Sequence, residues 1–197
     1  MNEINQNHRA ILQSIAHRAM LERGLLPDFS PEALVELGRL RSPAVSDTSL
    51  IYPYHAVRDM RNLLWCSIDN DDSLDLDQLT VAEAANSGKV KVLVAIADVV
   101  SSILKGSAID RHAQTNTTSV YTAAEIFPML PEKLSTDLTS LNYNQDRLAM
   151  VIEMLVSVDG TLEDAGIHPA WVRNHAKLAY NSVAAWLEKN ADMPEAI

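Results

Sequence analysis

Five aspartates lie within nine residues, from Asp69 to Asp77, and apolar residues flank the stretch on both sides. Carboxylates this close repel one another, so a folded chain accommodates them only where solvent or a cation offsets their charge. Hard divalent ions such as Mg²⁺ prefer oxygen ligands, and aspartate supplies these with little side-chain freedom to lose. The stretch therefore predicts either an acidic surface turn or a Mg²⁺ site.

The spacing of the aspartates excludes a calcium-binding loop of the EF-hand type. Numbered from Asp69, such a loop requires Gly at its sixth position and Glu at its twelfth, where this chain has Leu74 and Thr80. The chain has no Gly-rich phosphate loop ending in Lys-Ser or Lys-Thr, no His-Glu-x-x-His and no Gly-x-Ser-x-Gly. Its six histidines lack metal-ligand spacing, and Cys66 alone cannot form a disulfide framework or a Cys-rich zinc site.

The composition is that of a globular chain of moderate size. Its 197 residues are 47% hydrophobic and 21% charged, enough for one sizeable domain with a small helical appendage. A net charge of −10 argues against a nucleic-acid binder of the basic-patch kind, except for metal-dependent nucleases, whose site carboxylates are balanced by cations. No apolar segment approaches the ~18–20 residues that cross a bilayer. We therefore expect a soluble, cytoplasmic protein without membrane contact.

Two helices are predicted ahead of the aspartates. Apolar residues recur at helical spacing from Ile11 to Met20, and Gly24 is a natural stop. A second helix begins with Ser30 as N-cap and Pro31 at its first position. Residues 1–45 are therefore either a helical lead-in packed on the main domain or part of a helix-turn-helix that binds DNA. Residues 42–49 have the composition of a linker.

A strand and a hairpin are predicted around the aspartates. Residues 63–68 form a strand that enters the acidic stretch. Residues 74–100 form an antiparallel hairpin, because a partly alternating segment, the turn residues Asn86–Gly88 and a strongly apolar run follow one another. The hairpin ends near Asp98, for which a cap or turn role and a site role are equally supported.

The remaining pattern predicts an α+β fold, with a mixed or antiparallel sheet and packed helices. A helix is expected over 107–115, and paired strands over 148–158 and 165–168 on either side of the turn Asp159-Gly160. A last helix is expected from Trp171 to Glu188, where apolar residues recur at helical spacing.

The order of several short blocks is more specific than any one of them. The blocks are Ile-Asp-x(5)-Asp-x-Asp from Ile68, Val-Ala-Ile-Ala-Asp-Val from Val94, Thr-Ser-Val-Tyr from Thr118, Phe-Pro-Met-Leu-Pro from Phe127, Leu-Ser-Thr-Asp-Leu-Thr-Ser-Leu from Leu134, Asp-Arg-Leu-Ala from Asp146 and Ala-Lys-Leu-Ala-Tyr-Asn-Ser-Val from Ala176. From about Leu63 to Leu187 this series resembles the RNB catalytic domain of the ribonuclease II/R family.

The resemblance implies a processive 3′-to-5′ exoribonuclease that uses Mg²⁺ to hydrolyse single-stranded RNA to nucleoside 5′-monophosphates. Asp69, Asp75 and Asp77 fall on three of the four acidic positions that surround the scissile phosphate in the family. Tyr121 matches a tyrosine that stacks against a base at the RNA 3′ end, and Tyr180 matches one that holds the 3′-terminal nucleotide. The structural alternative for both tyrosines is a partly buried ring with a satisfied hydroxyl. Asp71 and Asp72 are expected to be a solvated loop.

The chain departs from the family pattern in two places near these residues. Gln78 stands at the fourth acidic position, and Asn116-Thr117 stand where the family often has Arg-Gly. Gln78 is neutral and a poor ligand for Mg²⁺, so it either weakens one ion or positions RNA. The substitution also motivates an alternative function, that of a non-catalytic RNA-binding or regulatory member of the family.

The length of the chain is a further departure. RNB domains continue with another acidic segment and a late arginine, and OB folds usually flank them. Residues 55–197 are therefore expected to be the amino-terminal part of an RNB domain, with the remainder in the same or another chain. Without the late arginine, which would stabilise developing phosphate charge, we expect the 197 residues alone to be nearly inactive.

Overall fold

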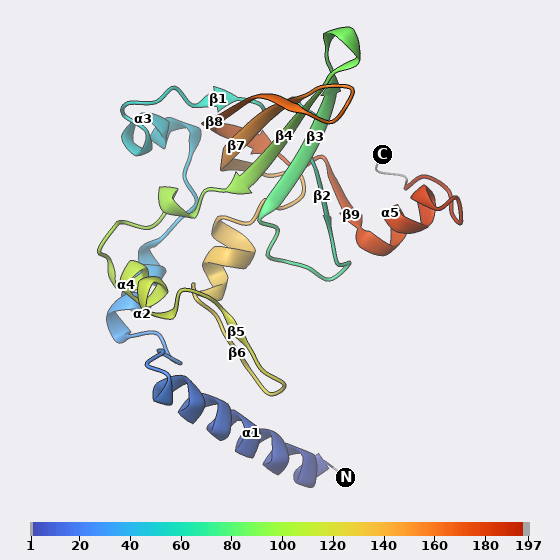
Figure 1. The fold of residues 1–197 in the computed structure, drawn as a ribbon. Helices are drawn as coiled ribbons and strands as arrows, with labels where there is room; N and C mark the ends of the chain where they lie inside the picture. Colours follow the sequence, from blue (N-terminus) through green and yellow to red (C-terminus); the bar gives the residue numbers. More distant parts are fainter. Residues whose placement is uncertain (1, 195–197) are drawn as a thin grey trace. The chain divides into compact units, whose positions relative to one another are not determined.

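The computed structural model describes residues 2–194, which form two compact units. One unit contains the chain up to Leu40 together with Ile103–Lys133, and the other contains Arg41–Ser102 and the chain from Leu134 onward. The second unit carries a seven-stranded mixed sheet in which most neighbouring strands are antiparallel, so the predicted α+β class is confirmed (Figure 1). Among the described residues, no helix combines the length and the apolar character needed to cross a bilayer.

The sheet of the second unit has the strand order β1-β8-β7-β4-β3-β2-β9. Its strands are β1 (Arg58–Asp59), β2 (Cys66–Asp69), β3 (Gln78–Ala84), β4 (Val90–Ala97), β7 (Asp146–Val156), β8 (Leu162–Arg173) and β9 (Ala176–Ala179). The pairs β1/β8 and β2/β9 are parallel, and all other neighbours are antiparallel. This unit also contains the helices α3 (Thr48–Ile51) and α5 (Tyr180–Leu187) and the short π-helix η4 (Leu134–Leu138). Its 3₁₀ turns are η1 (Val45–Asp47), η2 (Asn86–Gly88) and η3 (Val99–Ser101).

The predicted hairpin next to the aspartates is confirmed. β3 and β4 pair from Gln78↔Ile96 to Ala84↔Val90, and the turn is η2. In this turn Ser87 has φ 62° and Gly88 has φ 75°, the left-handed conformation that small turn residues tolerate best.

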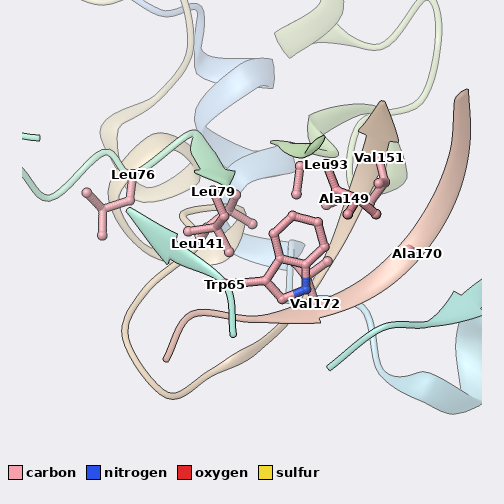
Figure 2. Packing of buried hydrophobic residues seen from close by; sticks show 10 residues of the cluster. Trp65, Leu76, Leu79, Leu93, Leu141, Ala149, Val151, Ala170 and Val172 are labelled. Carbon is pink, nitrogen blue, oxygen red and sulfur yellow. The ribbon is translucent and has the colours of Figure 1, made fainter. Parts of the chain in front are cut away.

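The core of this unit gathers around Trp65, which is fully buried just before β2. Its indole Nε1 donates a hydrogen bond to the Met60 carbonyl over 2.8 Å, so the one polar atom of the ring is satisfied. Around it pack Leu76, Leu79, Leu93, Ala95, Leu141, Ala149, Val151, Ala170 and Val172 (Figure 2). Leu76 and Leu141 belong to loops, and their burial ties both loops to the sheet.

The prediction of one helix from Trp171 to Glu188 is wrong in its first half. Trp171 to Arg173 complete β8, Ala176–Ala179 form β9, and only Tyr180–Leu187 are helical as α5. Of the apolar residues that matched a helical period, Val172 and Ala176 are instead buried strand residues. Long-range pairing with β7 and β2 decided their conformation, which local spacing does not report.

The stretch predicted as a linker over 42–49 also carries structure. It contains η1 and the start of α3, and the Trp171 indole donates a hydrogen bond to the Thr48 hydroxyl over 3.0 Å. Tyr52, which caps α3, donates its hydroxyl hydrogen to the carboxylate of Asp98. Thr48 within this stretch and Tyr52 just after it therefore hold this part of the chain against the sheet.

The first unit contains α1 (Asn2–Glu22), α2 (Pro31–Arg39), α4 (Ala108–Asn116) and the small hairpin of β5 (Val120–Tyr121) and β6 (Ile126–Phe127). All three predicted helices of this unit are confirmed, and the Ser30 hydroxyl caps α2 as expected by accepting from the Ala33 amide. The α4 amide of Ile109 donates to Glu36 of α2 over 3.1 Å. The predicted domain boundaries, and the DNA-binding alternative for the first helices, stay predictions.

Candidate metal and RNA site

Strand β2 ends at Asp69, beside the start of α5. β2 runs parallel to β9 with Asp69 in register with Ala179, and Tyr180 follows Ala179 as the first residue of α5. In Figure 1 these strands lie side by side, with the acidic loop leaving one and α5 leaving the other. The structure therefore places Asp69 and Tyr180, two predicted site residues far apart in the sequence, at neighbouring strand ends.

The first half of the acidic loop folds back onto Asp69. The Asp69 Oδ1 atom accepts hydrogen bonds from the Asn70 amide at 2.7 Å and from the Ser73 hydroxyl at 2.8 Å. The Ser73 amide donates to the Asn70 carbonyl over 3.2 Å and closes the turn. Asp71 and Asp72 at its tip are exposed. This matches the expectation that these two aspartates form the solvated part of the stretch.

A residue that the sequence analysis did not single out, Lys177, reaches the same turn from β9. Its Nζ atom donates to the carbonyl oxygens of Ser73 at 2.8 Å and Asp71 at 3.3 Å. The only sequence signal for it was its place in the block that supplied Tyr180.

The second half of the loop is anchored by Ser140, which is buried. Its hydroxyl accepts from the Leu76 amide at 3.1 Å and donates to the Leu74 carbonyl at 2.8 Å. The Leu141 amide donates to the Leu76 carbonyl, and the Ala97 amide donates to the Asp77 carbonyl. Hydrogen bonds to the backbone of Leu74, Leu76 and Asp77 thus fix this segment independently of any side-chain charge.

The carboxylates of Asp75 and Asp77 are directed away from the core. Both residues are exposed, while Leu76 between them is buried in the core cluster. This alternation is what an extended segment produces, and it leaves the two aspartates on the same side. Neither carboxylate forms a hydrogen bond or an ion pair with another residue in the described part of the chain. Gln78, the first residue of β3, is exposed next to Asp77 and pairs with Ile96.

Two further polar side chains, the buried Asn174 and the half-buried Arg147, hold the anchors of the loop. The Asn174 amide group donates to the Ser67 hydroxyl and to the Leu141 carbonyl, each over 3.0 Å, and so joins β2 to the segment after η4. The Arg147 guanidinium donates to the carbonyls of Ser140 at 2.9 Å and Asp137 at 3.0 Å. Burial lowers the pKa of Arg147 from its ordinary value, although the group remains a cation at neutral pH.

The donor chemistry of this loop suits a hard cation, but a complete protein cage is not preformed. Within residues 2–194, no three or more His, Cys, Asp or Glu side chains are close enough together to hold a metal ion. Mg²⁺ usually keeps several waters and binds one or two carboxylates plus substrate oxygens. Exposed aspartates on a fixed backbone fit that mode, and the metal roles of Asp69, Asp75 and Asp77 stay predictions.

Both predicted RNA-binding tyrosines have exposed rings. Tyr180 is 54% exposed and Tyr121 is 72% exposed, so a largely buried structural role does not account for either ring. Tyr121 belongs to the other unit, in the hairpin β5/β6, where it pairs with Ile126. The Thr122 amide and hydroxyl both donate to the Glu125 carbonyl and shape the turn. Exposed aromatic faces can stack on any base, which suits sequence-independent binding.

Asp98 has a structural role at the end of β4. It is 5% exposed, accepts the hydroxyl hydrogen of Tyr52, and caps η3 by accepting from the Ser101 amide at 3.2 Å. Burial, followed by the hydrogen bond to Asp98, raises the pKa of the Tyr52 phenol. Tyr52 therefore keeps its hydroxyl hydrogen and donates it to the Asp98 carboxylate. Of the two roles left open for Asp98, the structure supports the cap.

Asn116, where the family often has Arg, is buried at the end of α4. Its side-chain amide accepts from the Leu26 amide at 2.8 Å and donates to the Leu26 carbonyl at 2.9 Å. Thr117 follows with φ 57°, the left-handed conformation that a glycine would adopt without strain. Asn116 therefore pins the segment between α1 and α2 rather than facing solvent.

Comparisons with known proteins find sequence similarity to ribonucleases. A family model described as RNB domain matches residues 57–196. The chain is 39% identical over 137 residues to Ribonuclease R of Vibrio parahaemolyticus, covering 70% of this chain and 16% of that protein. It is 37% identical over 134 residues to Exoribonuclease 2 of Salmonella heidelberg, covering 68% of this chain and 21% of that protein.

A solved structure is similar over most of the chain. Mycoplasma genitalium RNase R in complex with double-stranded RNA matches with a TM-score of 0.77 and 26% identity, covering 90% of this chain and 31% of that one. The chain thus spans about a third of this structure's chain and between 16% and 21% of the curated relatives' length.

Proposed function

The chain belongs to the RNB domain family, and from this membership we propose that it forms the metal-binding part of a 3′-to-5′ hydrolytic exoribonuclease acting on single-stranded RNA. The products would be nucleoside 5′-monophosphates. The observation that carries the proposal is the anchored acidic loop, which presents Asp75 and Asp77 to solvent at one end and holds Asp69 beside Tyr180 at the other. A cytoplasmic location, where RNA turnover takes place, is part of the same proposal.

In this proposal each named side chain has one task. Asp69, Asp75 and Asp77 hold Mg²⁺, which when bound lowers the pKa of an attacking water and offsets phosphate charge. Tyr180 holds the 3′-terminal nucleotide, and Tyr121 stacks on a base without reading it, at about 1–3 kcal/mol per base. Gln78, with its exposed amide, hydrogen-bonds RNA next to Asp77. The buried Ser140 keeps the backbone of the loop in place, so these oxygens need little reorganisation.

The partner of this part would be the remainder of an RNB domain, in the same or another chain. The sheet supports this because the face opposite the core is also largely apolar. On the face opposite the core, eleven of twelve side chains in three adjoining rows are apolar, and none of the twelve is buried. The rows are Thr80, Val94, Ile152 and Ile167, then Ala82, Val92, Met154 and Ala165, then Ala84, Val90, Val156 and Leu162. Strands that are apolar on both sides are typical of a covered sheet.

The test combines Mg²⁺ binding, RNA binding and RNA hydrolysis in a polypeptide that carries this chain with the rest of an RNB domain. Asp77→Asn should lower hydrolysis of a 5′-labelled single-stranded RNA at least about a hundredfold, because a charged ligand becomes neutral where phosphate charge develops. RNA affinity should stay within about twofold of the original. The matched control is Asp164→Asn, an exposed aspartate on β8, which should leave hydrolysis unchanged. Equal hydrolysis by Asp77→Asn and the original would contradict the enzyme reading.

The same assays separate the second candidate function, a non-catalytic RNA-binding or regulatory protein, which Gln78 favours. If the site is catalytic with one weakened ion, Gln78→Asp restores a carboxylate beside Asp77 and raises the rate several-fold while lowering the Mg²⁺ needed. RNA binding without mononucleotide release, in both the original and Gln78→Asp, would establish the binding role instead.

A further inference from the structure

Lys177 shares a face of the sheet with Asp69. β9 alternates buried Ala176 and Leu178 with exposed Lys177, and its register sets Lys177 against Ser67 and Ala179 against Asp69. Side chains two residues apart along a strand point to the same face. Lys177 therefore emerges diagonally next to Asp69, where the acidic loop leaves β2.

Lys177 and Asp69 bind the same loop residue through different atoms. The Lys177 ammonium donates to the Ser73 carbonyl over 2.8 Å, while the Asp69 carboxylate accepts from the Ser73 hydroxyl over 2.8 Å. Lys177 also reaches the Asp71 carbonyl at 3.3 Å. Charge-assisted bonds of this kind are stronger than those between neutral groups. Ser73 is thus fixed from two sides, and with it one oxygen of Asp69.

We propose that Lys177 is a positioning residue that keeps the acidic loop ordered and the Asp69 carboxylate aimed before any cation arrives. The part that concerns Mg²⁺ rests on the proposed function, whereas the effect on the loop does not. Lys177 acts through Ser73 and the loop backbone, and nothing in its role requires contact with RNA.

Two effects of the lysine on Mg²⁺ binding oppose each other. Its positive charge repels the incoming ion, and its hydrogen bonds remove the need to order the loop when the ion binds. Water and salt screen the repulsion between exposed charges. Ordering several backbone residues, in contrast, has a large entropic cost that the ion would otherwise have to offset. Ordering therefore dominates, and loss of Lys177 weakens Mg²⁺ binding.

The experiment compares Lys177→Met with Lys89→Met in the full 197-residue chain. Lys89 is a lysine at the far end of β3/β4 that pairs with Glu163, so its loss changes the net charge equally without touching the loop. Amide hydrogen exchange at Asn70 and Ser73, followed by NMR without metal or RNA, should be about tenfold faster in Lys177→Met and unchanged in Lys89→Met. Lys177→Arg, which keeps a cationic donor, should retain most of the protection. Unchanged exchange at the amides of β4 shows that the fold is intact.

A titration with MgCl₂ on the same samples completes the test. The midpoint read from the loop amides should rise about fivefold to tenfold in Lys177→Met. Unaltered loop exchange in Lys177→Met, or a midpoint that falls, would overturn the proposal, the latter because repulsion then dominates. If the loop loosens as expected but the complete domain never hydrolyses RNA, the proposed function fails and the role of Lys177 in the loop stands.

Discussion

At the residue scale, the second half of the acidic loop owes its shape to buried polar side chains rather than to the aspartates themselves. Ser140 and Asn174 are each 1% exposed, and both use their side chains on backbone atoms of the loop or its anchors. A buried polar group left without a partner costs about 1–3 kcal/mol, so these residues specify one arrangement of the backbone. The carboxylates at the surface are then free for solvent, a cation or substrate.

Thr117 has a left-handed backbone conformation, which a β-branched side chain disfavours. We expect Thr117→Gly to raise the free energy of unfolding by about 0.5–1 kcal/mol, the strain removed being partly offset by the flexibility of glycine in the unfolded chain. The control is Thr115→Gly within α4, which should lower it by about 0.5 kcal/mol. Chemical denaturation measures both, and a loss of stability in Thr117→Gly would show that its hydroxyl bond to the Asn116 carbonyl matters more than the strain.

At the element scale, the long hairpin of β7 and β8 is closed at one end by ionic pairs. Asp146 begins β7, lies opposite Arg173 and accepts hydrogen bonds from Arg173 at 2.6 Å and from Arg61 at 2.8 Å. The bond from Arg173, followed by that from Arg61, holds the pKa of Asp146 below its ordinary value. Arg61 also bonds to Asp59, whose pKa falls to about 2. The cluster therefore joins β7, β8 and the segment before β2.

This cluster predicts a pH-dependent stability. A carboxyl group whose pKa is lower in the folded state stabilises the fold above its unfolded pKa, near 4, and loses that effect as pH falls towards the folded pKa. Asp146→Asn should therefore lower the free energy of unfolding by about 1 kcal/mol at pH 7, and this difference from the original should shrink below about pH 4. Urea unfolding at several pH values measures it. A difference that is equal at pH 7 and pH 3 would assign the effect to packing instead of charge.

At the scale of the whole molecule, the second unit is a sheet with a dense core on one face and an apolar, half-exposed surface on the other. At the Trp171 end of that surface, Thr48 and Tyr52 of the same unit form side-chain hydrogen bonds with Trp171 and Met150. A contiguous apolar surface of this kind marks an interaction site or an aggregation hazard. Its apolar composition fits the proposal that further RNB-domain structure covers it.

The two faces of the sheet predict very different losses of stability when a charge is introduced on the same strand. Ile167 is 70% exposed on the second face, whereas Val172 is fully buried in the core. Ile167→Lys should change the free energy of unfolding by no more than about 0.5 kcal/mol and reduce self-association of the 197-residue chain, measured by sedimentation velocity. Val172→Lys should cost more than about 3 kcal/mol or prevent folding, because it buries an unpaired charge. Severe unfolding by Ile167→Lys would show that the second face is already packed within this chain.

Local sequence determined the elements whose signals are local. Ser30 and Ser107 cap their helices, the hairpin from Gln78 to Ala97 turns at Asn86–Gly88, and the ordered blocks identified the family. Caps, turns and period-two alternation depend on residues within a few positions of one another, so they can be recognised without a fold. The acidic stretch itself, and the division between Asp71–Asp72 at its tip and the aspartates at its ends, was also visible in the sequence.

Tertiary structure decided everything that depends on pairing between distant segments. The parallel pairing of β2 with β9 made residues 176–179 of a predicted helix a strand, placed Tyr180 beside Asp69 and brought Lys177 to the acidic loop. Contacts between distant segments also decided that Asp98 accepts the Tyr52 hydroxyl and that Asn116 holds the segment between α1 and α2. The physical reason is that strand register and buried hydrogen bonds depend on the packing of the whole core. The sequence of one segment does not specify which distant segment it will pair with.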